Sequence, residues 1–198
     1  MGKFRNCTFY LSGPMQYAKD QSWKKKLVDY FQRNGVPYFD PVVKDAETVK
    51  AVIYQGKGRA QVEEFEDSVP YFERLLAEGK YDDVAKKMRI IREIDLAVVR
   101  KSDIVIVYFD LETPTFGTWD EVYEADRCGK IILWVFDHDD LKKIPLWLYG
   151  VIKDMRLVFR NVDQLIAFLN SDKVCSILNR CICGKCWSAV CSKDCCAK

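Results

Sequence analysis

The amino-acid sequence predicts an α/β fold built on a doubly wound parallel sheet, and three observations support this. Short apolar runs typical of buried strands occur at 8–11, 36–39, 104–109 and 131–136. Segments with apolar residues at helical spacing separate these runs. A strand, a helix and a second strand in succession imply parallel pairing. The expected architecture is therefore Rossmann or flavodoxin-like, with a helical insertion and a cysteine-rich C-terminal tail.

The first strand–helix–strand unit has clear boundaries. The run at 8–11 stops at a Ser-Gly-Pro turn, and residues 21–34 carry apolar side chains at helical spacing. Gly35 follows and is typical of the end of a helix. The run at 36–39 then predicts the second strand, which an Asp-Pro pair closes.

Residues 44–94 have a different composition, dense in charged residues with sparse but periodic apolar positions. This pattern predicts two or three helices that form an insertion or a lid over the sheet edge. A solvated helical hairpin with no part in chemistry is the alternative. A further helix is expected over 90–100, before the central strand at 104–109.

The second half of the chain continues the alternation. A helix begins near residue 117, and Gly129-Lys130 separates it from the strand at 131–136. A short helix, an edge strand and a closing helix are expected at 145–148, 155–159 and 162–170. We assign residues 1–170 to the α/β domain and 171–198 to the tail.

The composition excludes some classes of function. The chain has 198 residues, 49% of them hydrophobic, and a formal net charge of +2, so bulk charge gives no reason to expect nucleic-acid binding. No apolar run reaches the roughly 18 residues of a membrane span, and no signal-peptide pattern follows Met1. We therefore expect a cytoplasmic protein without membrane contact.

The helix near residue 117 places one acid on its apolar face. By spacing, Glu121 shares a face with Ala125 and Cys128, and we expect this face to be buried. A second face, expected to be solvated, carries Asp120, Glu124 and Arg127. Glu121 thus points inward at the carboxyl end of a strand, where open α/β sheets bind ligands. A partly desolvated carboxylate there is a candidate nucleophile or general base.

Each of the residues that suggest chemistry also has a structural interpretation. Thr118 and Glu121 have the spacing of a capping box, which satisfies N–H groups at the start of a helix. Tyr10, at the end of the first strand, either orients the Glu121 carboxylate through its phenol or is a core tyrosine. Asp95 lies four residues after Ile91 on a core-facing helix, so it either reaches the site or is a helix-surface aspartate.

Two carboxylates at one site suggest glycosidic chemistry, in which one acts as nucleophile and the other assists the leaving group. The loops after three strands should open on the same edge of the sheet. The substrate-binding candidates lie on or next to these loops: Ser12, Gly13, Pro14, Met15, Asp40, Asp110, Thr115, Gly117 and Thr118.

Three motifs follow one another along the chain: Tyr10-Leu-Ser-Gly-Pro-Met15, then Asp95 eight residues before Asp103, then Gly117-x3-Glu121-x3-Ala125 followed by Gly129-Lys130. Their order and spacing over residues 6–136 resemble the nucleoside 2-deoxyribosyltransferase family. The resemblance implies a doubly wound α/β domain that cleaves the N-glycosidic bond of a (deoxy)nucleoside. It implies that Glu121 is the nucleophile, that Tyr10 steadies it, and that Asp95 contacts the base and helps to protonate it.

The resemblance also implies partners and cofactors. A nucleoside or nucleotide and a free base are the expected ligands, the protein is expected to be a homo-oligomer, and the chemistry needs no cofactor. The long insertion and the Trp119-Asp120 pair are similar to a divergent, phage-type branch of the family.

Some positions depart from the family pattern. Thr115 stands where transferases often carry an aspartate, and Pro114-Thr115 is similar to the Pro-Ser of the related deoxynucleoside-monophosphate N-glycosidases. The Gly- and Arg-bearing loop of those hydrolases is absent from the sequence at 15–19. Three functions therefore stay open: a transferase, an N-glycoside hydrolase, and a non-catalytic nucleotide-binding or sensor module.

The C-terminal tail holds seven of the nine cysteines. The spacing Cys183-x2-Cys186-x4-Cys191-x3-Cys195 can supply four thiolates to one structural Zn²⁺. An unstructured tail or lipid-bearing cysteines are the alternatives. The tail has five basic and two acidic residues, a net +3, which together with Trp187 suits a weak nucleic-acid contact. The other two, Cys7 and Cys128, are expected to be small core residues.

Overall fold

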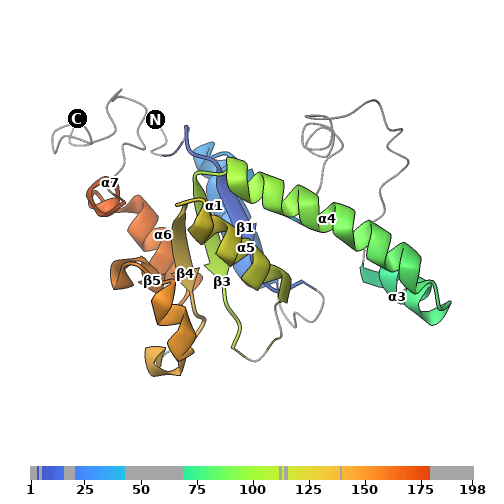
Figure 1. The fold of residues 1–198 in the computed structure, drawn as a ribbon. Coiled ribbons are helices and arrows are strands. Elements are labelled where there is room, and N and C mark those ends of the chain that lie inside the picture. The colour runs from blue at the N-terminus through green and yellow to red at the C-terminus, as the bar shows by residue number, and fades with distance from the viewer. Residues whose placement is uncertain are drawn as a thin grey trace.

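The computed structural model describes residues 4, 6–15, 21–42, 69–111, 113, 116–138 and 140–178. These residues form a five-stranded sheet in the order β2-β1-β3-β4-β5, and every pairing is parallel (Figure 1). The strands are β1 (Phe9–Ser12), β2 (Tyr38–Phe39), β3 (Ile104–Tyr108), β4 (Ile131–Val135) and β5 (Val158–Phe159). The predicted fold class is confirmed.

Helices cover both faces of the sheet. The described helices are α1 (Ser22–Asn34), α3 (Val69–Ala77), α4 (Tyr81–Lys101), α5 (Phe116–Arg127), α6 (Val162–Asn170) and α7 (Val174–Ile177), with short 3₁₀ turns η1 (Leu141–Lys143), η2 (Leu146–Gly150) and η3 (Met155–Leu157). One apolar core joins the sheet to α1, α6 and α7, and a second joins it to α4, α5 and η2. The sheet is therefore the middle of three layers, as in other doubly wound folds.

Strand β1 is buried on both faces because each face packs against a helical layer. Successive side chains of a strand point to opposite faces. Phe9 and Leu11 belong to the core on the α1 side, whereas Tyr10 belongs to the core on the α5 side. Ser12 follows the same alternation as Tyr10. A four-residue strand thus directs two hydroxyl groups toward α5.

Helix α1 begins and ends close to its predicted bounds. Its buried face carries Trp23, Leu27 and Phe31, at the spacing of an amphipathic helix. Gly35 adopts a left-handed conformation with φ of 62°, and its N–H bonds the last turn of the helix. The confirmed position of this glycine explains why the helix stops there and the chain turns back into β2.

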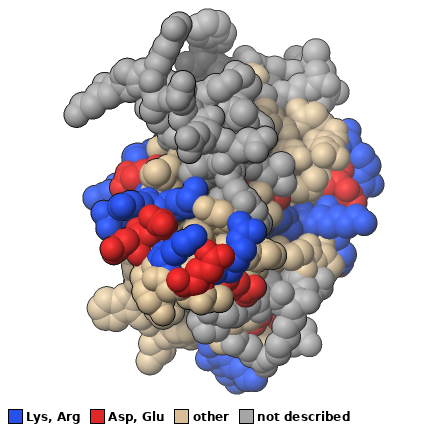
Figure 2. All heavy atoms as spheres, turned by 90° about the vertical axis from the view of Figure 1, so that its right-hand side faces the viewer, with Lys and Arg blue, Asp and Glu red and all other residues tan. Residues whose placement is uncertain are grey.

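One helix runs across the predicted boundary of the insertion near residue 94. Tyr81–Lys101 is one continuous helix, α4, so the expected helix at 90–100 is its second half. The first half carries mostly exposed side chains and extends with α3 beyond the sheet (Figure 1). Seen from that side, Lys and Arg lie interspersed with Asp and Glu (Figure 2). Residues 43–68 lie outside the described part, and the lid stays a prediction.

The C-terminal elements follow the prediction with one change. Within the expected edge strand, residues 155–157 form a 3₁₀ turn, and the pairing with β4 is made by Val158 and Phe159. Helix α6 has the predicted bounds. Val174 and Leu178 are buried in the core on the α1 side, so packing of the described chain continues past residue 170. The four predicted zinc ligands, Cys183, Cys186, Cys191 and Cys195, lie outside the described residues.

The two cysteines of the body have different environments. Cys7 is buried, as predicted, but Cys128 is exposed, and the prediction for it is wrong. Helix α5 ends at Arg127, so Cys128 lies in the turn that leads to Gly129 rather than on the buried face. In the described ranges we find no helix with both the length and the apolarity of a membrane span.

Candidate active site

Glu121 lies on the buried face of α5, as its spacing predicts. Its neighbours Val122 and Ala125 are fully buried against the sheet, and Glu121 itself is 7% exposed. The loops that follow β1, β2 and β3 share one edge of the sheet because these strands are parallel. Helix α5 starts after β3, and Glu121 lies in its second turn, so the Glu121 carboxylate lies at this edge.

Two hydroxyl groups of β1 hold the Glu121 carboxylate. The Tyr10 phenol donates a hydrogen bond of 2.6 Å to Oε1, and the Ser12 hydroxyl donates to Oε2. The capping-box alternative is wrong, because α5 begins at Phe116 and Thr118 lies inside it as the third residue. The carboxylate is therefore oriented by the neighbouring strand rather than used to cap its own helix.

The Tyr10 phenol is surrounded by negative charge. Burial raises its pKa well above the usual value, and Glu121, Asp95 and Asp40 raise it further. Its ring stacks on Phe39 with centroids 5.7 Å apart. A phenol with such a pKa stays protonated at neutral pH, so Tyr10 remains a hydrogen-bond donor to Glu121.

Asp95 is the second inward acid, and the structure buries it. It is 6% exposed on α4, between Ile94 and Leu96, which belong to the buried part of that helix. Its charge acts on the Tyr10 phenol. The surface-aspartate alternative is therefore wrong. The structure brings Asp95, Tyr10 and Glu121 from three separate elements to one edge of the sheet, and their catalytic roles stay predictions.

Gly13 serves the packing of the first loop. A Cβ at this position would lie 2.5 Å from Cζ2 of Trp23 and 3.3 Å from the carbonyl oxygen of Tyr108. The Trp23 indole stacks almost parallel on Tyr108, with centroids 4.6 Å apart. In the same loop, Pro14 accepts a hydrogen bond of 2.9 Å from Gln21, and Met15 is exposed. The loop is thus fixed to the start of α1.

Asp40 follows β2 and forms an ion pair with Lys24, which is not among the site residues predicted from the sequence. Lys24 Nζ lies 3.0 Å from Asp40 Oδ1, and both side chains are nearly buried. The same oxygen accepts the backbone N–H of Val42. A signal for Lys24 existed, because its spacing of three and seven places it on the buried face with Leu27 and Phe31.

The remaining substrate-binding candidates lie around α5. Asp110 accepts a hydrogen bond from the Thr113 hydroxyl within the loop after β3. Gly117 is exposed and Thr118 is buried in the first turn of the helix. Thr115 lies outside the described residues. A substrate-binding role for each of these residues stays a prediction.

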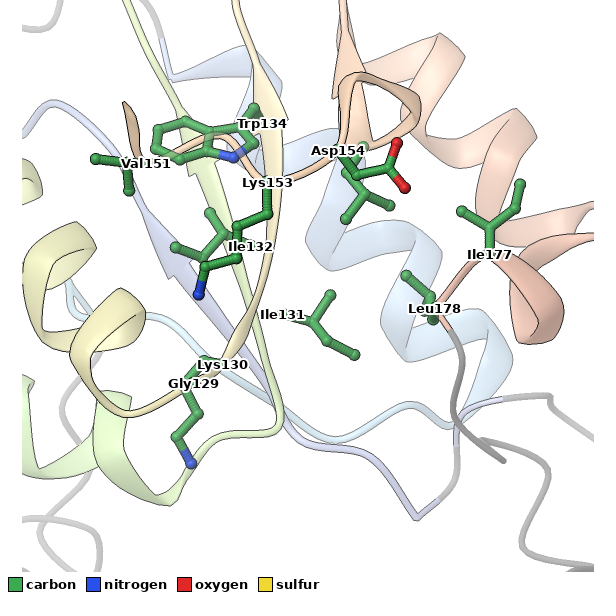
Figure 3. Close-up of a pocket in the computed structure, with 11 residues that line it drawn as sticks. Gly129, Lys130, Ile131, Ile132, Trp134, Val151, Lys153, Asp154, Ile177 and Leu178 are labelled. Atoms are coloured by element: carbon green, nitrogen blue, oxygen red, sulfur yellow. The ribbon is translucent and has the colours of Figure 1, made fainter. Parts of the chain in front are cut away.

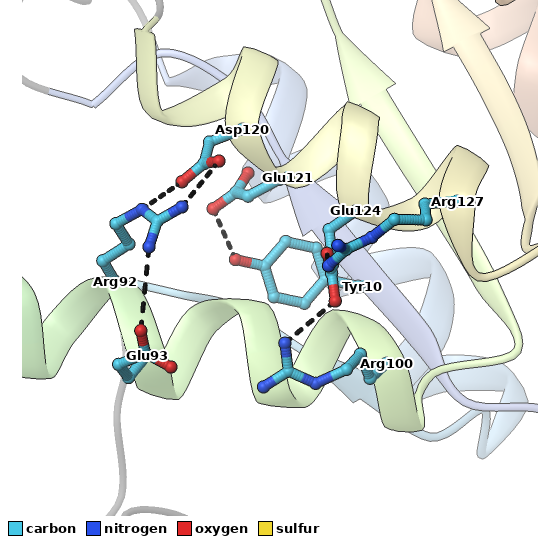
Figure 4. A network of polar contacts seen from close by, with 8 residues as sticks. All are labelled: Tyr10, Arg92, Glu93, Arg100, Asp120, Glu121, Glu124 and Arg127. Carbon is cyan, nitrogen blue, oxygen red and sulfur yellow. Dashed lines mark hydrogen bonds and ion pairs between the residues drawn. The ribbon is translucent and has the colours of Figure 1, made fainter.

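Two arginines of α4 connect that helix to α5 (Figure 4). Arg92 forms a two-pronged hydrogen bond with Asp120, and Arg100 Nη1 lies 2.9 Å from Glu124 Oε1. Arg127 contacts the second oxygen of Glu124. The prediction that Glu124 is solvated is wrong, because α4 covers it and leaves its side chain 5% exposed. The hydrogen bond from Arg100 lowers the pKa of Glu124 below its usual value.

A cavity of about 220 Å³ lies away from these acids, around the start of β4 (Figure 3). Ile131, Ile132 and Leu157 contribute to its lining. The start of a parallel strand is at the edge of the sheet opposite to Glu121. Two of its charged lining residues already have partners, since Lys153 pairs with Asp126 and Asp154 with Arg156. We therefore place the candidate site by its chemistry, at the carboxyl edge.

Comparison with known proteins gives similarities of structure. A 2-deoxyribosyltransferase from the psychrotolerant bacterium Bacillus psychrosaccharolyticus is 14% identical, with a TM-score of 0.49 over 82% of this chain and 95% of the other. A conserved protein from Enterococcus faecalis V583 is 15% identical, with a TM-score of 0.44 over 82% and 96%. No family model and no curated protein matches the sequence. These similarities concern the arrangement of the chain and identify no substrate.

Proposed function

We propose that this protein cleaves the N-glycosidic bond of a (deoxy)nucleoside or its monophosphate and transfers the deoxyribosyl group to another base. One observation carries the proposal. A buried glutamate at the carboxyl edge of the sheet has each oxygen held by a neutral hydroxyl, and a second buried acid lies nearby. The ordered motifs around Tyr10, Asp95 and Glu121 support the same chemistry.

In the first step, a carboxylate oxygen of Glu121 attacks C1′ of the sugar. The C1′–N bond breaks as the C1′–O bond forms, and the base leaves with the electron pair of the broken bond. Asp95 supplies the proton that neutralises the departing base. Tyr10 and Ser12 keep the carboxylate oriented, which saves the cost of ordering it during the reaction.

In the second step, a new base attacks C1′ of the glycosyl ester, the C1′–O bond breaks, and Glu121 is released as a carboxylate. Asp95, left as a carboxylate by the first step, takes the proton from the attacking nitrogen and returns to its starting form. Water in place of the base would give hydrolysis, so the two activities differ in the acceptor and share the covalent intermediate. Every role in these steps falls to a side chain of the protein, and the proposal calls for no cofactor.

The first experiment presents the purified protein with 2′-deoxynucleosides, ribonucleosides and their 5′-monophosphates, each with and without a free base. Chromatography follows base release and base exchange. Exchange that needs the second base is the expected result, whereas release into water alone would identify a hydrolase. The absence of both from the whole panel would contradict an enzymatic function.

The covalent step has a direct test with a matched control. A 2′-fluoro nucleoside slows loss of the sugar from the enzyme, because fluorine disfavours the positive charge that develops at C1′. Mass spectrometry should find the sugar on the peptide that contains Glu121 in the wild type and in Glu124→Gln. Glu121→Gln should stay unlabelled. The sensor alternative would be favoured if the wild type is inactive and unlabelled while Glu121→Ala still binds the nucleoside in calorimetry.

A further inference from the structure

We propose that Lys24 is a positioning residue of the candidate site, whose buried ammonium group offsets the charge of Asp40 so that Glu121 can ionise. The inference rests on the proposed function, because the ionised Glu121 is the nucleophile in that scheme. Lys24 belongs to no motif of the sequence and acts through Asp40 rather than on a substrate.

The burial of Lys24 is unusual for its residue type. The residue is only 6% exposed. A lysine is almost never buried to this extent unless a charged partner compensates its ammonium group. Its Nζ lies 3.0 Å from Asp40 Oδ1 and 5.4 Å from the centre of the Trp23 ring. The ion pair joins the first turn of α1 to the end of β2, so it fixes Asp40 at the edge of the sheet that carries Glu121.

A short chain of contacts leads from Asp40 to Glu121. Asp40 directly follows Phe39, which pairs in register with Tyr10 and stacks on its ring. The Tyr10 phenol then donates to Glu121. Charge at Asp40 acts on the phenol, so a change at either member of the ion pair is transmitted to the neighbourhood of the carboxylate.

In the described part of the chain, the charged side chains around Glu121 and Tyr10 come from several elements. Helix α4 contributes Asp95 and Arg92, α5 itself contributes Asp120 and Glu124, the end of β2 contributes Asp40, and α1 contributes Lys24. The arginines are engaged with Asp120 and Glu124. On the β1–β2 side of the site, Lys24 pairs with Asp40.

This arrangement predicts shifts of opposite sign for the two partners. Lys24→Met leaves the Asp40 carboxylate uncompensated, and added negative charge makes Glu121 harder to ionise. Asp40→Asn leaves the ammonium uncompensated and makes Glu121 easier to ionise. Each shift should be about 0.5–1 pH unit, as expected for one charge acting through partly buried surroundings. The double variant, with a neutral pair, should return to the wild-type value.

The test measures the titration midpoint of the Glu121 carboxyl by ¹³C NMR on protein labelled at glutamate. Glu121→Gln assigns the signal, and the measurement needs no turnover. We expect a higher midpoint in Lys24→Met, a lower one in Asp40→Asn and the wild-type midpoint in the double variant. The acid limb of kcat/KM should move in the same directions.

The outcomes separate this inference from the proposed function. Equal midpoints in all four proteins would overturn the charge role of Lys24, whether or not the enzyme turns over. If the Glu121 midpoints shift as expected but the protein is inactive on the whole nucleoside panel, the electrostatic effect of the Lys24–Asp40 pair is supported and the proposed function is refuted. A loss of thermal stability alone would show that Lys24 is structural. If Lys24→Met fails to fold, Asp40→Asn and the double variant still provide the comparison.

Discussion

Glu121 and Glu124 lie three residues apart on α5, and both are almost completely buried, yet their surroundings differ in kind. Glu124 faces α4 and receives two arginines, Arg100 and Arg127. Glu121 faces the sheet and receives two neutral hydroxyls, with further acids nearby. One carboxylate is paired with arginines, and the other is held by hydroxyl groups.

Under the proposed function, this difference separates a structural carboxylate from a reactive one. Paired cations lower the pKa of Glu124 and hold it ionised, which makes it a weak base and a poor nucleophile. The two hydroxyl donors restrict the Glu121 carboxylate to one orientation without adding positive charge to it. In this proposal, the partners of a buried acid, rather than its burial, distinguish the catalytic glutamate from the structural one.

The largest effect is expected from removing the two hydroxyl groups that bind the Glu121 carboxylate. Tyr10→Phe and Ser12→Ala each remove one hydrogen bond to a charged group, so each should lower kcat/KM by roughly 10- to 100-fold. Steady-state kinetics on the best substrate of the panel measures the loss. Tyr30→Phe is the matched control, because the Tyr30 phenol bonds Asn170 on the other side of the sheet. Full activity of both β1 variants would contradict the proposal that these hydroxyl groups prepare Glu121, and not Glu124, for catalysis.

The second effect concerns stability. Glu124→Gln should lower the free energy of unfolding by about 1–2 kcal/mol, a value kept small because both arginines are partly exposed to solvent. Glu121→Gln should cost less, since it removes a desolvated charge that two neutral hydroxyl groups hold in place. Urea unfolding at neutral pH compares the two variants. A larger loss in Glu121→Gln would reverse the assignment of roles.

The lowered pKa of Glu124 predicts how the stability difference between wild type and Glu124→Gln depends on pH. A carboxyl whose pKa is depressed on folding stabilises the protein above its unfolded value, here 4.5, and loses this contribution as pH falls through the folded value. The stability gap between wild type and Glu124→Gln should therefore be largest near neutral pH and close in acid. Unfolding curves at a series of pH values follow the gap, and a constant gap would contradict the ion-pair explanation.

The smallest effect is expected at the exposed end of the α4–α5 contact. Arg92→Met removes an ion pair with Asp120 that lies largely in solvent, so its unfolding midpoint should shift less than that of Glu124→Gln. The shift should vanish in about 1 M salt, where exposed charges are screened. A large, salt-independent shift would mean that Arg92 acts through packing instead.

Local sequence patterns predicted the strands, the start and end of α1, and the inward face of Glu121. These features depend on spacing within one element and on residues such as Gly35 with a conformational preference of their own. The contact between Tyr10 and Glu121 was also predictable, because parallel strands bring their carboxyl ends to one edge.

The errors arise where a second element decides the environment. Periodicity placed Glu124 on a solvated face, but α4 covers that face and supplies Arg100. Cys128 was assigned to a buried face that ends one residue earlier with the helix. Lys24 was overlooked because lysine is usually exposed, although its spacing placed it among apolar residues. Contacts between distant segments are absent from any local window of sequence.

Strand β1 has a consequence for how this protein can diversify. Tyr10 and Ser12 are fully buried, and the residues between and beside them, Phe9 and Leu11, pack the opposite core. Folding the sheet therefore also builds the pair of hydroxyl groups that holds the Glu121 carboxylate. Under the proposed function, substitutions at these four positions are penalised twice, once through core packing and once through the chemistry. New substrate preferences are accordingly easier to reach through the loops at the carboxyl edge than through the strand itself.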